Sequence, residues 1–122
     1  MLRLFSEGTV IDFDQFKKVA DTLSQHTAAI EPDAGYEVFI DEPSGRAAFL
    51  ETWPSGQALL RHVGWMVESK VVEQVLACYS PDRLSALDPV TDPQVAEVAR
   101  QFGALELERI SAVNPTDGIA GA

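Results

Sequence analysis

The sequence is short of cysteine and of positive charge, and each shortage excludes broad classes of protein. Cys78 is the single cysteine among 122 residues, so no disulfide can form within the chain, and we expect a reducing compartment, the cytoplasm. Lysine and arginine number 9 against 19 aspartate and glutamate residues, which gives a formal net charge of -10. Because nucleic acids and anionic membrane surfaces select basic patches, we expect neither as a partner.

Long apolar runs and the common cofactor motifs are missing as well. No segment approaches the roughly 20 apolar residues of a membrane span, and residues 1–10 have no signal-peptide pattern, so we expect neither. The sequence also has no glycine-rich phosphate loop, no nucleophile elbow and no closely spaced pair of zinc ligands. We therefore expect no nucleotide, flavin or metal cofactor.

The sequence does contain regular alternation of strand and helix patterns, and its length suits one domain. We expect that domain over residues 1–113, followed by a flexible tail at 114–122. Alternating or clustered apolar residues indicate five strands, at residues 2–11, 36–41, 46–53, 83–87 and 104–110.

Helical spacing of apolar residues follows three residues that can cap a helix: Asp12, Ser55 and either Thr91 or Asp92. The second of these helices is expected to run on to about residue 79, with Gly64 as the point where it would break. The order of elements predicts an α+β, ferredoxin-like β-α-β-β-α-β fold with an antiparallel sheet, plus an additional C-terminal α-β unit.

The predicted strands are apolar on both faces. Tyr36 and Val38 point one way while Phe39 points the other, and Leu50 likewise opposes Phe49. A sheet that helices cover on one side only should be polar on the other. We therefore expect a homodimer in which the sheets of two copies pack face to face.

One segment, GYEVFIDEPSGRAAFLETWPSGQALLRH at residues 35–62, resembles the antibiotic biosynthesis monooxygenase-like domain of the dimeric α/β-barrel superfamily. The resemblance covers roughly residues 2–79. It is carried by a glycine, an aromatic-rich strand, an acidic-x-Trp group at the end of the next strand, and a histidine on the following helix. These positions are Gly35, Tyr36, Glu51, Trp53 and His62.

The resemblance implies a homodimer with a cavity in each subunit between its sheet and its helices. The best-understood enzymes of the family oxidise polycyclic phenols with molecular oxygen and no cofactor. A haem-degrading branch also exists, but its catalytic tryptophan is replaced by His62 here, and its haem-ligating histidine would fall near Val72. We therefore do not expect haem degradation.

His62 is the candidate catalytic residue, as the base that removes a phenolic or carbon-bound proton before reaction with oxygen. Trp53, Trp65 and Tyr36 are the candidate substrate-binding residues, as flat walls for an aromatic ligand. The structural alternative for each aromatic ring is that it fills the core. The alternative for His62 is a hydrogen-bonded histidine at the edge of its helix.

Two functions remain open from the sequence. One is a cofactor-independent oxygenase of small aromatic or quinone-like substrates. The other is a non-catalytic dimeric module that binds a small ligand or is associated with stress. A largely apolar cavity at His62 that can hold a ring-sized ligand favours the enzyme, and a fully packed interior favours the module.

Overall fold

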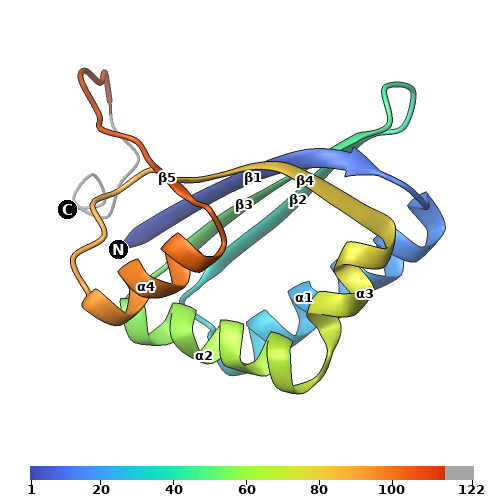
Figure 1. Ribbon diagram of the computed structural model, residues 1–122, viewed down its shortest axis with the longest axis horizontal. Coiled ribbons are helices and arrows are strands. Elements are labelled where there is room, and N and C mark those ends of the chain that lie inside the picture. Colours follow the sequence, from blue (N-terminus) through green and yellow to red (C-terminus); the bar gives the residue numbers. More distant parts are fainter. Residues whose placement is uncertain (115–122) are drawn as a thin grey trace.

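A computed structural model describes residues 1–114 of the chain; the predicted tail, from residue 115 onward, lies outside the described residues. This part contains strands and helices in the order β1-α1-β2-β3-α2-α3-β4-α4-β5 (Figure 1). The strands are β1 (Leu2–Val10), β2 (Gly35–Asp41), β3 (Arg46–Trp53), β4 (Tyr79–Ala86) and β5 (Leu105–Glu106). The helices are α1 (Phe13–Ile30), α2 (Gly56–Glu68), α3 (Val71–Cys78) and α4 (Pro93–Gln101).

The strands form one sheet in the order β2-β3-β1-β4-β5. The pairs among the first four strands are antiparallel, which is the ferredoxin-like arrangement. β5 joins β4 in parallel, so the predicted antiparallel sheet is mixed at this edge. The helices lie together on one face of the sheet (Figure 1). The predicted fold class is therefore confirmed.

The helix starts follow the predicted caps. The side chain of Asp12 accepts a hydrogen bond from the Gln15 backbone N–H at 3.1 Å, and that of Ser55 accepts one from Ala58 at 3.2 Å. Asp92, rather than Thr91, caps α4. Each cap satisfies a backbone donor that the first turn of a helix leaves without a partner.

The predicted long helix is divided at Lys70 and not at Gly64. Lys70 has the left-handed backbone conformation, with φ of 63°, and it separates α2 from α3. Gly64 lies inside α2, where it costs helix stability without breaking the helix. The polar residues at the end of α2 therefore mark the break better than the glycine does.

The strand predicted at 83–87 begins earlier, at Tyr79, and Pro81 lies within it. Proline is accommodated because β1 and β4 shift register between Glu7 and Gly8, opposite this point. The strand predicted at 104–110 is shorter: β5 comprises Leu105–Glu106, which pair with Ser85 and Ala86 at the end of β4, and the Leu107 N–H donates a hydrogen bond to the Ala86 carbonyl.

The sheet's two faces differ. The face toward the helices carries the core, which includes the buried side chains of Phe16, Phe49 and Trp53. The outer face carries Phe39, which is 52% exposed, together with exposed charged side chains such as Glu37. The outer face is thus partly apolar and partly charged. No helix in the described part of the chain has the length and apolar character needed to cross a bilayer.

Candidate functional site

A cavity of about 260 Å³ lies between the inner face of the sheet and helices α2, α3 and α4. Most of its lining is apolar, including Leu4, Phe49 and Leu59. Two lining side chains, Leu76 of α3 and Phe102 at the end of α4, are about half exposed at 55% and 51%, so the cavity opens between these helices. A dry cavity of roughly 150 Å³ holds a benzene ring. This one therefore has room for a larger ring compound.

Four side chains lie together at the cavity wall, and we call them the Glu51 cluster: Tyr36, Glu51, Trp53 and His62. Alternation along β3 places both Glu51 and Trp53 on the inner face, and Tyr36 pairs with Glu51 across β2 and β3. His62 comes from α2; its ring centroid lies 4.7 Å from that of Trp53 and 5.6 Å from that of Tyr36. Tyr36, Glu51 and His62 line the cavity.

Glu51 is a carboxyl group in apolar surroundings. Burial raises its pKa to about 7, and the hydrogen bond that Trp53 Nε1–H donates to Glu51 Oε1, at 3.0 Å, lowers the pKa in part. Both protonation states of Glu51 are therefore populated near neutral pH. Such a group can accept or donate a proton under the conditions in which most enzymes work.

His62 is 4% exposed, and the same burial acts on it in the opposite sense. Its pKa falls to about 4, first because of burial and then because of the charge of His26, whereas Glu31 raises it. The imidazole is therefore neutral at pH 7, a hydrogen-bonding group but a weak base. Burial and then the Glu51 charge raise the pKa of Tyr36 well above its usual value, so Tyr36 is a neutral phenol.

A second polar point faces the cavity at Tyr79, whose ring lies 5.3 Å from that of Phe49. The Tyr79 hydroxyl is buried and makes no hydrogen bond of ordinary geometry with residues 1–114. Burial raises its pKa, and the neighbouring Ser6 hydroxyl lowers the pKa in part. Since a buried hydroxyl without a partner is costly, Tyr79 can bind a polar atom of a ligand.

The structure separates the four predicted site residues into two groups. His62 and Tyr36 line the cavity together. Trp53 is fully buried behind them, and its ring packs against His62. Trp65 lies farther out and stacks on His26, with ring centroids 3.5 Å apart. Neither tryptophan lines the cavity itself.

Glu51 is the residue that sequence reasoning missed. It appears there as one position of the acidic-x-Trp group, with no role in the site. The available signal was its alternation with Phe49 and Trp53, which puts a carboxyl group on the buried face of a strand. A charged residue is seldom buried unless it is paired or functional.

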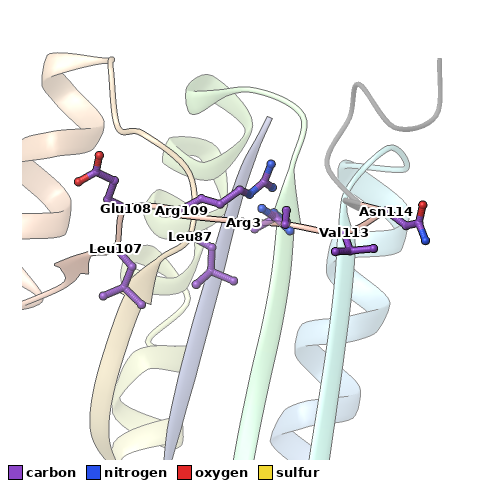
Figure 2. A pocket seen from close by; sticks show the side chains of 8 residues that line it. Arg3, Leu87, Leu107, Glu108, Arg109, Val113 and Asn114 are labelled. Atoms are coloured by element: carbon purple, nitrogen blue, oxygen red, sulfur yellow. The ribbon is translucent and has the colours of Figure 1, made fainter.

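A second, shallower hollow lies at the end of the sheet, where Arg3, Leu107 and Arg109 are among the residues that line it (Figure 2). The Arg3 guanidinium forms two hydrogen bonds with Asp88, each of 3.0 Å. Glu108 and Arg109 are exposed there. This hollow shares no lining residue with the interior cavity, and Glu51 and His62 line only the interior cavity. The Glu51 cluster therefore remains the candidate site.

Comparisons with known proteins support the fold. MupZ from Pseudomonas fluorescens superposes with a TM-score of 0.76 at 13% identity, over 94% of each chain. An antibiotic biosynthesis monooxygenase superposes with a TM-score of 0.59 at 24% identity, over 75% of this chain and 100% of the other. Rv0793 from Mycobacterium tuberculosis gives 0.57 at 16% identity, over 75% and 97%. No protein-family model and no curated protein matches the sequence.

These likenesses show that the chain has the fold of antibiotic biosynthesis monooxygenase structures, as the resemblance predicted. The likeness to MupZ also reaches beyond the ferredoxin-like core. That core ends at residue 86 of 122, about 70% of the chain, whereas the superposition covers 94%. At least part of the C-terminal unit with α4 and β5 is therefore shared with MupZ.

Proposed function

We propose that this chain is a cofactor-independent oxygenase that acts on a small aromatic or quinone-like compound bound in the interior cavity. The observation that carries the proposal is the Glu51 cluster in the wall of a mostly apolar, ring-sized cavity. The fold of a monooxygenase structure supports it by analogy.

The chemistry requires a base, a dry site and dioxygen. Removal of a hydroxyl or carbon-bound proton from the substrate leaves an electron-rich anion that can reduce oxygen. For a ring CH₂ group the overall reaction is CH₂ + O₂ → C=O + H₂O, in which carbon is oxidised by four electrons and dioxygen is reduced by four. An apolar cavity favours this sequence because it keeps competing water away from the anion.

The charges around the cavity favour a neutral substrate. Its described lining contains Glu51 but no lysine or arginine, and the whole chain carries a net charge of -10. An anionic ligand would meet a like charge in a poorly solvated site. The Tyr79 hydroxyl offers a hydrogen bond to a second oxygen of the ligand, as a quinone-like compound would provide.

We assign His62 as a catalytic residue and Tyr36 as a substrate-binding residue, since both line the cavity. Trp53 and Trp65 do not line the cavity, and we assign them to substrate binding as the rings that support His62 from behind. Their ring centroids lie 4.7 and 6.1 Å from that of His62, so both limit where the imidazole can lie.

We further propose that the chain works as a homodimer joined through the outer face of the sheet. Phe39 on β2 is exposed there, and the half-buried Leu50 on β3 lies beside Phe5 on β1. Face-to-face packing of two sheets would remove these side chains from water.

Anthrone and 1,4-dihydroxynaphthalene are suitable probes, because each combines a ring system with an acidic proton. We expect the wild type to bind them, with quenching of tryptophan fluorescence, and to consume oxygen faster than a protein-free control. His62→Ala should lower the rate roughly 100-fold, as the loss of a hydrogen-bonding group at the reacting oxygen does. Glu68→Gln is the control, because Glu68 is exposed at the end of α2 and does not line the cavity.

The outcomes separate the two functions. Oxygen uptake that His62→Ala leaves unchanged would remove His62 from the mechanism. Binding without oxygen uptake would favour a non-catalytic ligand-binding module. Absence of both binding and uptake would contradict the proposed function.

A further inference from the structure

The cavity contains two groups that could take a proton, and they are not equivalent. We propose that Glu51 is the catalytic residue that accepts the proton of a bound hydroxyl group, and that Trp53 is the positioning residue that holds its carboxylate. This assignment rests on the proposed function and gives His62 a different part in it, as a neutral hydrogen-bonding partner of the ligand.

One oxygen of the Glu51 carboxylate is fixed by a hydrogen bond, which orients the whole group. Its Oε1 accepts the Trp53 Nε1–H bond of 3.0 Å, and Trp53 itself is 0% exposed. The Trp53 ring packs against both Tyr36 and His62, with centroid distances of 6.5 and 4.7 Å. Because a carboxylate has about four lone-pair directions, a fixed Oε1 leaves Oε2 able to accept from a ligand in the cavity.

The titratable groups described in the cavity lining besides Glu51 are Tyr36, His62 and Tyr79, and each is neutral at pH 7. Tyr36 of β2 and Tyr79 of β4 remain phenols because burial raises the pKa of each. His62 of α2 is a neutral imidazole with a pKa of about 4, whereas that of Glu51 is about 7. A base with a pKa near 7 accepts a proton roughly a thousandfold more readily than one near 4. Proton acceptance therefore belongs to Glu51.

The proton transfer is balanced within the cavity. The O–H bond of the ligand breaks, its electron pair stays on the ligand oxygen, and its proton binds Oε2 of Glu51. The negative charge moves from the carboxylate to the ligand, so the buried pair keeps the same total charge throughout. That is favourable where solvation is poor, because no second charge is created. The proton later leaves in the water formed from dioxygen.

A pair of matched ligands tests this assignment without any turnover. 2-Naphthol can donate a hydrogen bond to the carboxylate, and 2-methoxynaphthalene cannot. We expect the ratio of their dissociation constants, methyl ether over naphthol, to rise roughly tenfold between about pH 5.5 and 8.5, as Glu51 ionises. Fluorescence quenching or calorimetry measures the ratio.

Three variants interpret the ratio. In Glu51→Gln, which keeps the shape of the side chain, the ratio should not change with pH. In the wild type, the hydrogen bond from Trp53 Nε1–H lowers the pKa of Glu51. Trp53→Phe removes this bond, so the rise in the ratio should move to higher pH. Glu68→Gln, at the exposed end of α2, should behave as the wild type. A pH-independent ratio in the wild type, or failure to bind either ligand, would overturn the proposal.

An oxygen-uptake measurement separates this inference from the proposed function. If the wild type oxidises anthrone, Glu51→Gln should reduce the rate at least roughly 100-fold. Full activity of Glu51→Gln would overturn the assignment and leave the oxygenase standing. A wild type that binds with the expected pH-dependent ratio but consumes no oxygen would remove the oxygenase and keep Glu51 as the group that binds the hydroxyl.

Discussion

Glu51 and His62 share one cavity, and burial disfavours the charge of both. In the folded state the pKa of Glu51 is about 7, so Glu51 stays protonated below that pH. The pKa of His62 is about 4, so His62 stays neutral above that pH. In the unfolded chain both would titrate near their ordinary values of 4.5 and 6.5. The two residues therefore affect stability in opposite directions over nearly the same pH range.

This opposition gives a prediction for stability against pH. Between about pH 4.5 and 6.5, Glu51 holds a proton only when folded, so its contribution falls as the pH rises, whereas the His62 contribution rises by a similar amount. In Glu51→Gln only the His62 contribution remains. We expect its free energy of unfolding to rise by about 2–3 kcal/mol more than that of the wild type over this range.

Urea denaturation at several pH values measures the effect, with Glu68→Gln as the control for loss of an exposed carboxylate. Parallel stability curves for Glu51→Gln and the wild type would show that folding does not raise the pKa of Glu51.

Single residues in the site were predictable to different degrees. His62 and Tyr36 could be placed near a cavity from the strand and helix pattern and the family resemblance. The role of Glu51 depends on its burial, which the sequence shows only as alternation along one strand. The stacking of Trp65 on His26 depends on how α1 and α2 approach each other, and no local pattern records that approach.

At the scale of elements, replacing either of two glycines with alanine should change stability in opposite directions. A Cβ on Gly8 would lie 2.2 Å from the Ser80 carbonyl oxygen, where β1 shifts its register against β4. Gly8→Ala should therefore lower the free energy of unfolding by at least about 2 kcal/mol through overpacking. A Cβ on Gly64, inside α2, would meet nothing within 4 Å. Gly64→Ala should raise stability by about 0.5–1 kcal/mol.

Urea unfolding followed by circular dichroism compares the two variants under one condition. The first serves as a probe of the strand register and the second as its matched control. A Gly8→Ala variant as stable as the wild type would contradict the close approach of β1 and β4.

Element order was predictable because caps and apolar spacing are local signals. Asp12 and Ser55 cap their helices as expected. The start of β4 was not predictable from local signals, since Tyr79 continues the apolar spacing of the preceding helix yet pairs with Val10 of β1. Pairing with a strand about seventy residues earlier overrides the helical pattern, as tertiary contacts commonly do.

At the scale of the whole molecule, the outer face of the sheet gives a prediction about assembly. Phe39, 52% exposed on β2, would lie in the proposed interface. We expect the wild type to sediment as a dimer at micromolar concentration and Phe39→Glu to weaken association at least roughly tenfold, because a buried unpaired charge is costly. Ile11→Glu is the control, since Ile11 is 65% exposed and lies outside the strands.

Sedimentation velocity over a range of concentrations distinguishes the two variants. A monomeric wild type at micromolar concentration would contradict the homodimer, and equal effects of both substitutions would place the interface elsewhere.

The opening of the cavity between α3 and α4 has a consequence for timing. α4 is held by its packing through Val95 onto α2 and by the two-residue pairing of β5 with β4. Because β5 pairs with β4 over only two residues, α4 and β5 have little resistance to local opening. We infer that the residence time of a bound ligand is set by how often α4 and β5 open locally.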